Sequence, residues 1–232
     1  MSLDKVRTAL VDATSDVEAL NTSSSGNISS RLNNKHFLVT PSGKNEFSAR
    51  DTVMVEVGTG QSVDQEHKRA STEKDLHAQI YKVRPDNGAI VHFHSKLTIS
   101  IAGVSPWPAK VPYAIPLFHT DLWRLGIEGV HRGVPFAAYA HPGSLELAIK
   151  VAEIFKGNFI KAAIMERHGA IVLGKDIDEA VQNALLLEHL SDAYLMNVSL
   201  ARDSGRNQLF FSPEEFDQFR RHVQQIGYVG KL

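Results

Sequence analysis

Two apolar runs that lie three residues apart constrain the fold of this chain more than any other feature. Residues 161–165 (KAAIM) and 169–174 (GAIVLG) have the composition of strands, and the chain breaks between them at Arg167-His168-Gly169. A parallel pair of strands needs a crossover of a dozen or more residues, whereas antiparallel strands can be joined by a tight turn. The two runs therefore predict an antiparallel pair and argue against an all-parallel sheet.

Helices and strands alternate along the rest of the chain. The polar stretch 21–30 (NTSSSGNISS) is expected to be a loop, and residues 104–135, which are rich in proline and glycine, give no clear assignment. Short apolar runs predict further strands over residues 36–40, 52–58, 89–94 and 134–140. Apolar residues at helical spacing predict helices over residues 4–20, 71–83, 96–103, 144–156, 176–201 and 212–227.

This alternation predicts the fold class and the domain organisation. We expect an α/β fold, a single-domain layered sandwich in which helices flank a central mixed, mostly antiparallel sheet. The length of 232 residues suits one large domain, and no internal repeat or low-complexity linker divides the chain. The expected domain covers residues 1–232, with residues 201–232 as a C-terminal helical tail.

Composition and charge exclude several classes of function. A formal net charge of −1 gives no electrostatic basis for binding nucleic acid or an anionic membrane. Residues 1–16 lack the apolar segment of a signal peptide, and no apolar run approaches the roughly 20 residues of a membrane helix. We therefore expect a soluble cytoplasmic protein. The chain has no cysteine, so a metal site would use His, Asp, Glu or backbone oxygen.

A His-x-His pair, His92 and His94, lies inside the apolar run 89–94. Side chains two residues apart on a strand point to the same face, and their Cα atoms lie roughly 6.5–7 Å apart. Two imidazoles at this spacing can converge on one metal ion. The chain has 11 histidines, however, and buried histidines often only satisfy hydrogen bonds, so the pair alone leaves both interpretations open.

Two further residues are candidates to complete a metal site. His168 is followed by Gly169, and a glycine here permits a close approach of the backbone or an unusual turn. Glu73 lies in the first turn of a predicted helix, where the helix dipole alone also favours an acid. His168 is thus the expected third ligand, and Glu73 is either the fourth partner or a structural acid.

Five segments of the chain form a pattern that is far more specific together than singly: SSGNIS (24–29), TPSG (40–43), STE (71–73), VHFHS (91–95) and RHGAIVLGKDIDEA (167–180). Their order resembles the class II aldolase family, which includes fuculose-phosphate aldolase, ribulose-phosphate 4-epimerase and the adducin head domain. The resemblance covers roughly residues 4–200. It implies a class II aldolase-like fold and, as is typical of the family, a homotetramer with active sites between subunits.

The resemblance also implies roles for individual residues. His92, His94 and His168 match the three histidines that bind one divalent metal ion per subunit, usually Zn²⁺, with Mn²⁺ or Co²⁺ also possible. Glu73 matches the acid that ligates the resting metal and acts as acid/base. Tyr113 lies where the aldolase has a tyrosine that reaches into the neighbouring subunit's site. The positions that match the binding site of the substrate phosphate are Gly26, Asn27, Ser42, Gly43, Ser71 and Thr72.

The reaction implied by the resemblance is that of a metal-dependent lyase. Such an enzyme cleaves or forms a carbon–carbon bond through a metal-stabilised enediolate, and an aldolase acting on a short-chain ketose phosphate is the leading hypothesis. Glu73 and Thr40 resemble the aldolase, since the epimerase usually has aspartate and lysine there. His119-Thr120-Asp121 instead resembles the His-Ala-Asp of the epimerase, so Asp121 is a catalytic candidate or merely a helix cap.

Other functions remain open at this point. One alternative is a ribulose-phosphate 4-epimerase-like sugar-phosphate epimerase. Another is a decarboxylase of a keto or hydroxy-aromatic carboxylic acid, in which Arg124 or Lys44 would contact the carboxylate. A non-catalytic interaction domain like the adducin head is disfavoured, because it would be expected to have degraded metal ligands. No role is assigned to His119, His131, His141, Trp107, Trp123 or Tyr228.

Overall fold

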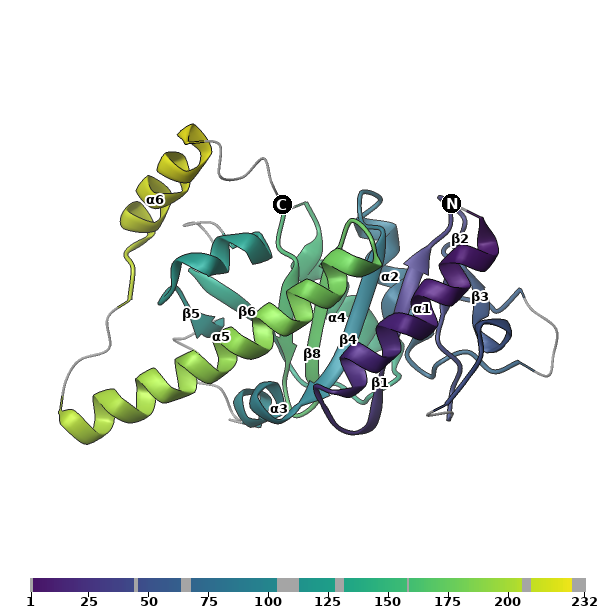
Figure 1. The fold of residues 1–232 in the computed structure, drawn as a ribbon, viewed down its shortest axis with the longest axis horizontal. Helices are drawn as coiled ribbons and strands as arrows, with labels where there is room; N and C mark the ends of the chain where they lie inside the picture. Colours follow the sequence, from purple (N-terminus) through teal and green to yellow (C-terminus); the bar gives the residue numbers. More distant parts are fainter. Residues whose placement is uncertain are drawn as a thin grey trace.

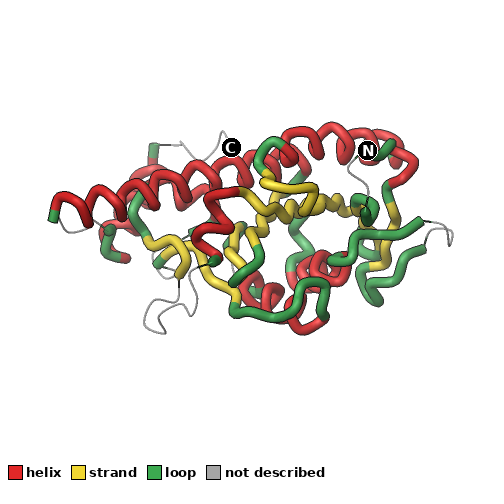
Figure 2. Tube along the Cα trace, turned by 90° about the horizontal axis from the view of Figure 1, so that it is seen from below, coloured by secondary structure: helices red, strands yellow, loops and turns green. Residues whose placement is uncertain are grey.

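The structure is a computed structural model in which a central sheet lies between two layers of helices (Figures 1 and 2). It describes residues 2–43, 46–63, 68–103, 113–127, 132–157, 159–205 and 210–226. Lys44, Trp107, His131 and Tyr228, which the sequence brings into consideration, lie outside these ranges.

The described helices agree with the helical spacing of the sequence. Each expected helix is present, with ends that shift by at most three residues. The helices are α1 (Leu3–Glu18), α2 (Lys74–Val83), α3 (Lys96–Ala102), α4 (Leu145–Phe155), α5 (Ile177–Ser204) and α6 (Pro213–Gln225), with the short 3-10 helices η1 (Ala49–Asp51) and η2 (Thr120–Leu125). None of the described helices is long and apolar enough to cross a membrane.

The described strands form one eight-stranded sheet with the order β3-β2-β1-β4-β8-β7-β6-β5. Every neighbouring pair is antiparallel except β6 and β7, so the sheet is mixed and mostly antiparallel, as expected. The strands are β1 (Asn21–Arg31), β2 (His36–Val39), β3 (Val53–Glu56), β4 (Ala89–Ser95), β5 (Tyr113–Pro116), β6 (Gly133–Ala137), β7 (Ala162–Met165) and β8 (Gly169–Gly174).

Strand β1 shows that the expectation of a loop over residues 21–30 was wrong. Ser29 and Ser30 are buried in this strand, and Ile28 is the apolar residue of its paired part. The strand lacks an alternation of apolar and polar residues. Its polar side chains can be buried because they find hydrogen-bond partners inside the fold. Its pairing with β4 is interrupted by a bulge between Asn21 and Gly26.

The centre of the sheet is covered on both faces. Helices α1 and α5 pack on one face and α2 and α4 lie on the other (Figures 1 and 2). Every residue of β7 and β8 is buried, which explains why these strands read as continuous apolar runs rather than as alternating ones. In the proline-rich middle of the chain, which the sequence left unassigned, the structure places β5, η2 and the start of β6.

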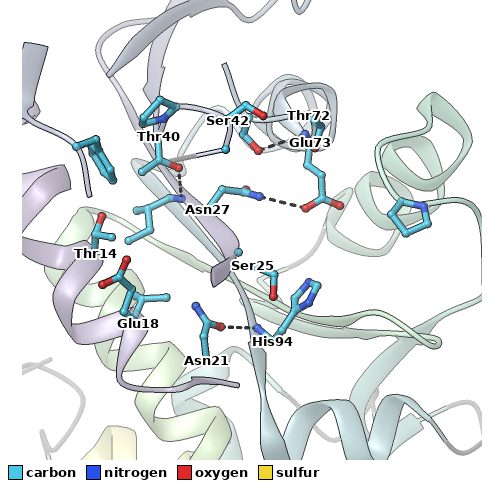
Figure 3. A pocket seen from close by; sticks show the side chains of 18 of the residues that line it. Thr14, Glu18, Asn21, Ser25, Asn27, Thr40, Ser42, Thr72, Glu73 and His94 are labelled. Atoms are coloured by element: carbon cyan, nitrogen blue, oxygen red, sulfur yellow. Dashed lines mark hydrogen bonds between the residues drawn. The ribbon is translucent and has the colours of Figure 1, made fainter. Parts of the chain in front are cut away.

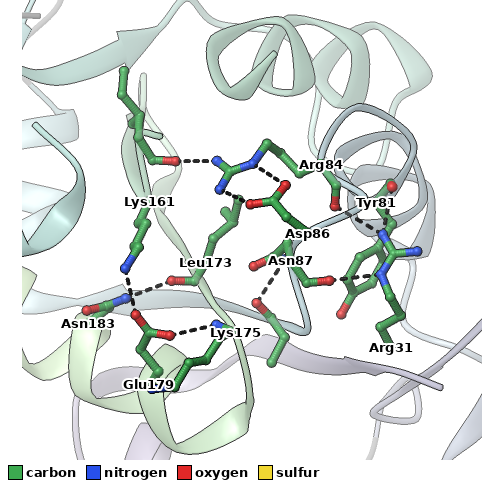
Figure 4. A network of polar contacts seen from close by, with 12 residues as sticks. Arg31, Tyr81, Arg84, Asp86, Asn87, Lys161, Leu173, Lys175, Glu179 and Asn183 are labelled. Carbon is green, nitrogen blue, oxygen red and sulfur yellow. Dashed lines mark hydrogen bonds and ion pairs between the residues drawn. The ribbon is translucent and has the colours of Figure 1, made fainter. Parts of the chain in front are cut away.

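A network of polar contacts joins the helix layers around one end of the sheet (Figure 4). The guanidinium of Arg84, at the end of α2, donates to both carboxylate oxygens of Asp86 at 2.9 and 2.7 Å. It also donates to the carbonyl of Ile160 at 2.8 Å, next to β7. Lys161 in turn pairs with Glu179 of α5 at 2.6 Å. These contacts fix the ends of α2, β7 and α5 relative to one another.

Candidate metal centre and cavity

The structure brings the three histidines of the sequence pattern together. Strand β4 carries His92 and His94 on one face, and His168 lies in the link just before β8. Because β4 pairs with β8 in the register Phe93 with Ala170, that link lies beside the two β4 histidines. The three ring centroids are 4.7 to 4.9 Å apart, and one ring nitrogen of each histidine lies within 4.8 Å of the others.

Gly169 has the close contact that the sequence led us to expect. A Cβ atom at this position would lie 2.6 Å from the carbonyl oxygen of Phe93 and 2.7 Å from Cδ2 of His94. The unusual turn is at Arg167 instead, which has a left-handed φ of 54°. Gly169 is therefore required by space beside His94, and not by its own backbone conformation.

Glu73 faces the three histidines from the start of α2, where it is the N-cap residue and 7% exposed. Its Oε2 lies 3.0 Å from Nε2 of His92, and its Oε1 lies 3.2 Å from Nε2 of His168. The amide Nδ2 of Asn27 donates to Oε2 at 3.1 Å. The Glu73 side chain does not cap its own helix. Its carboxylate is therefore directed to the histidine cluster rather than to the helix start.

The hydrogen bonds around His92 show that this cluster fits a cation. Nδ1 of His92 must donate to the carbonyl of Ala170, 2.8 Å away, because a carbonyl only accepts. In the neutral ring, the lone pair of Nε2 then points at Glu73 and at Nε2 of His94, which is 2.9 Å away. A proton or a metal ion on Nε2 would replace the repulsion between this lone pair and the Glu73 carboxylate by attraction.

The electrostatics of the individual groups agree with this preference for positive charge. Burial lowers the pKa of His92, but the neighbouring Glu73 carboxylate outweighs burial, so the net shift is upward. Burial would raise the pKa of Glu73, yet His92 and His168 outweigh it and hold that pKa well below its usual range. Burial together with its two histidine neighbours lowers the pKa of His94 to about 3. The cluster thus keeps a carboxylate and at least one neutral imidazole ready as ligands.

Two buried atoms of the cluster are left without a hydrogen bond to any described residue, namely Oε1 of Glu73 and Nδ1 of His168. Buried polar atoms rarely stay unpaired. Oε1 faces the histidine nitrogens, so an ion there would satisfy it. Three imidazole nitrogens and a carboxylate are a ligand set that suits Zn²⁺ and similar divalent ions. The residues present therefore fit a divalent metal ion, whose identity this ligand set does not fix.

A cavity of about 300 Å³ opens beside the cluster (Figure 3). His94, His168 and Glu73 lie in its wall. No Lys or Arg occurs among the described residues that line it, so hydroxyls, amides and backbone N–H groups would bind an anion here. All six residues that the sequence assigns to phosphate binding line this cavity: Gly26, Asn27, Ser42, Gly43, Ser71 and Thr72.

Two predicted catalytic residues lie elsewhere in this chain. Tyr113 is on β5 and Asp121 is in η2, and neither lines the cavity. The exposed pair His119 and Asp121 interact with each other, because Nδ1 of His119 accepts the backbone N–H of Asp121 at 3.2 Å. His119, not Asp121, is therefore the cap of η2. Arg124 lines a different cavity, so it is not placed to bind a ligand beside the histidines.

Sequence reasoning missed two residues that support the site. Asn21 accepts the backbone N–H of His94 at 2.7 Å, which replaces a ladder hydrogen bond where β1 bulges. His77 lies one helical turn beyond Glu73 on α2 and is fully buried against Asn27. The spacing of Glu73, His77 and Tyr81 was a readable signal, because residues four apart share a helix face.

Comparison with known proteins extends these observations. The family model described as Class II Aldolase and Adducin N-terminal domain matches residues 11–195. L-fuculose phosphate aldolase of Haemophilus influenzae is 32% identical over 180 residues, 78% of this chain and 76% of that protein. The 5-methylthioribulose-1-phosphate/5-deoxyribulose-1-phosphate aldolase of Rhodospirillum rubrum is 28% identical over 198 residues, 84% of this chain and 83% of that protein.

Solved structures share the fold. An L-fuculose 1-phosphate aldolase matches with a TM-score of 0.78 at 24% identity and covers 95% of this chain and 96% of its own. The L-fuculose-1-phosphate aldolase of Thermus thermophilus matches with a TM-score of 0.68 at 22% identity, over 88% of this chain and 98% of its own. At these identities the likeness concerns the arrangement of helices and strands.

Proposed function

Because the chain belongs to the Class II Aldolase and Adducin N-terminal domain family, we propose that it is a divalent-metal-dependent carbon–carbon lyase, an aldolase that acts on a short-chain ketose phosphate. The observation that carries the proposal is the convergence of three histidine nitrogens and the Glu73 carboxylate at one end of a cavity whose described wall includes hydroxyls, an amide pair and glycines, together with a second acid, Glu18. The aldolases among its relatives support the substrate class.

His92, His94 and His168 would hold the metal ion, with Glu73 as an additional ligand in the absence of substrate. The ion would supply Lewis-acid polarisation of a substrate carbonyl. Zinc is our proposed ion because imidazole and carboxylate ligands suit it, although Mn²⁺ and Co²⁺ accept the same set. By analogy with the family, we propose a cytoplasmic homotetramer of single-domain subunits, in which residues 201–232 form a C-terminal tail.

Glu73 is the proposed acid/base. Its carboxylate lies at the boundary between the histidines and the cavity, where it can take a proton from the carbon next to the substrate carbonyl. Its low pKa keeps it ionised near neutral pH. The hydroxyls of Ser42, Ser71 and Thr72, with the N–H groups of Gly26 and Gly43, would bind the substrate phosphate through neutral donors. The site thus orients the substrate and moves its proton.

The relatives named above are aldolases, and they favour this activity over its alternatives. Of the two cations that a decarboxylase could use for the substrate carboxylate, Arg124 lines another cavity, and Lys44 lies outside the described residues. Asp121, which an epimerase would use, lies outside this cavity, and its position does not distinguish the two reactions if the sites lie between subunits. Tyr113 is likewise remote in this chain, and we propose that it acts in a neighbouring subunit's site.

Proton exchange tests the proposal. The metal-loaded protein is incubated with dihydroxyacetone phosphate in heavy water, and the carbon-3 proton signal is followed by NMR. We expect metal-dependent loss of one proton in the wild type and a roughly 100-fold slower loss in Glu73→Gln, because the general base is removed. Asp75→Asn, which removes another acid at the start of α2, is the control and should retain exchange. No exchange by metal-loaded wild type would refute this substrate assignment.

A further inference from the structure

A buried ladder of polar side chains leads away from Glu73 between α2 and β1. Glu73, His77 and Tyr81 are four residues apart on α2, and Asn27 and Ser29 are two apart on β1. Four residues of a helix rise about 6 Å and two residues of a strand about 6.6 Å. The spacing of these side chains along α2 therefore nearly equals their spacing along β1, so that side chains of the helix can contact side chains of the strand.

The contacts of this ladder are short and continuous. From Oε2 of Glu73 the chain runs to Nδ2 of Asn27 at 3.1 Å, and from Oδ1 of Asn27 to Nε2 of His77 at 2.5 Å. Nδ1 of His77 lies 2.6 Å from the hydroxyl of Ser29, which lies 2.9 Å from the hydroxyl of Tyr81. Ser29 and His77 are fully buried, and Tyr81 is 1% exposed. Water therefore does not replace these partners. Figure 3 shows the Asn27–Glu73 end.

The chemistry of the groups fixes the direction of every hydrogen bond. An ionised carboxylate only accepts, so the Asn27 amide must present its NH₂ group to Glu73 and its oxygen to His77. An amide oxygen also only accepts, so His77 carries its proton on Nε2. With a neutral ring, Nδ1 accepts from Ser29, and Ser29 accepts from Tyr81. All donors thus point toward Glu73.

His77 is held in this neutral form. Burial lowers its pKa to about 3, so the ring carries one proton at neutral pH. The opposite tautomer, with the proton on Nδ1, would leave Nε2 as an acceptor facing the amide oxygen. The Asn27 amide would then have to turn over and place its oxygen against the Glu73 carboxylate. The Ser29 and Tyr81 hydroxyls oppose this change because they supply a donor to Nδ1.

From this geometry we propose that His77 is a positioning residue for Glu73, which acts through the amide of Asn27. The inference rests on the proposed function only in giving Glu73 the role of acid/base. The ladder keeps an N–H donor on the carboxylate, so that Glu73 has a fixed orientation whether it contacts the histidines or a substrate. Asn27 also lines the cavity, so the same amide group lies in its wall. His77 therefore sets the orientation of both Glu73 and this amide.

The tautomer of His77 is the first test, and it does not depend on any activity. The protein is labelled with ¹⁵N-histidine, and the spectrum of His77→Gln identifies the His77 signals. We expect a protonated Nε2 and an unprotonated Nδ1 at neutral pH, with and without zinc. A protonated Nδ1, or a ring protonated on both nitrogens, would overturn the proposal.

Two variants provide the second test. His77→Phe retains a ring but removes the donor, whereas His77→Gln retains an N–H that can reach Asn27. We expect His77→Phe to slow proton exchange about tenfold at equal zinc occupancy, as is typical of losing a residue that orients a catalytic group. His77→Gln should restore most of the rate. His189→Gln, an exposed histidine on α5, is the control.

The outcomes separate the positioning role from the proposed function. A His77→Phe rate equal to wild type, or a His77→Gln rate as low as that of His77→Phe, would overturn the positioning role. If wild type itself shows no exchange, the proposed function fails, and the tautomer still decides whether His77 positions Asn27. If His77→Phe does not fold, the tautomer measurement likewise decides whether His77 positions Asn27.

Discussion

Replacing Gly169 with alanine is the sharpest test of how the histidine cluster is built. The backbone of Gly169 is in an ordinary conformation, because positive φ in this link belongs to Arg167. Any effect of an added methyl group is therefore steric. Its Cβ would lie 2.6 Å from the Phe93 carbonyl oxygen and 2.7 Å from Cδ2 of His94.

The size of the effect follows from these distances. Ordinary van der Waals contacts begin at about 3.5 Å, whereas the added Cβ would lie 2.6 Å from the Phe93 carbonyl oxygen. The link or the atoms around it must therefore move by about 0.9 Å, the difference between these distances. Ligands need to be held within about 0.5 Å of their working positions. We expect zinc affinity to fall roughly 10–100-fold, which is the range for disturbed support of a ligand, and metal-free stability to fall by about 1–3 kcal/mol.

Zinc affinity can be measured by competition with a chelating dye, and stability by urea unfolding of the metal-free protein. Gly58→Ala is the matched control, because no atom of a described residue other than its chain neighbours lies within 4 Å of a Cβ added there and its φ is not positive. It should leave both quantities unchanged. If Gly169→Ala binds zinc as tightly as Gly58→Ala, His94 is not held as a ligand by this contact.

Three further predictions concern stability. Between pH 7 and 5 the metal-free wild type should lose about 2 kcal/mol more unfolding free energy than His77→Phe, because His77 has a pKa of 6.5 when unfolded and about 3 when folded, so only the unfolded chain gains the proton. Parallel pH profiles in urea unfolding would contradict this. Arg84→Met should cost about 1–3 kcal/mol, since it removes the hydrogen bond from the buried guanidinium to the Ile160 carbonyl; a thermal melt like that of wild type would argue against this. Ser144→Ala should cost about 1 kcal/mol, because the Ser144 hydroxyl accepts the Leu147 N–H at the start of α4. A loss below about 0.3 kcal/mol in urea unfolding would show that this cap is not needed.

Burial on both sides made the centre of the fold predictable from sequence. Strand β8 begins and ends at the residues expected, because each of its six residues is buried and apolar or glycine. The antiparallel pairing of β7 with β8 followed from the short link alone. The pairing of β4 with β8, which places His168 beside the β4 histidines, was not predicted; His168 was named from the glycine that follows it and from the family pattern.

Strand β1 could not be predicted, because its buried side chains are polar. Ser29 is fully buried, and it is satisfied by His77 and Tyr81, which lie 48 and 52 residues further along the chain. The local sequence gives no indication of partners so far along the chain, and a polar stretch considered alone is typical of a loop. The four-residue spacing of Glu73, His77 and Tyr81 marked a shared helix face, but the role of His77 depends on its contact with Asn27, which this spacing does not reveal.

The length of α5 has a consequence for the local stability of the molecule. With 28 residues the helix is about 42 Å long, and its C-terminal part extends past the sheet (Figure 1). Its buried residues end at Ser191, and Met196 and Leu200 are exposed. The free energy of opening a backbone amide to solvent should therefore fall along the helix, from nearly the global value at its start to a small value near Ser204. Amide hydrogen exchange would show this as a gradient within one continuous helix, and any surface that covers the distal turns would flatten it.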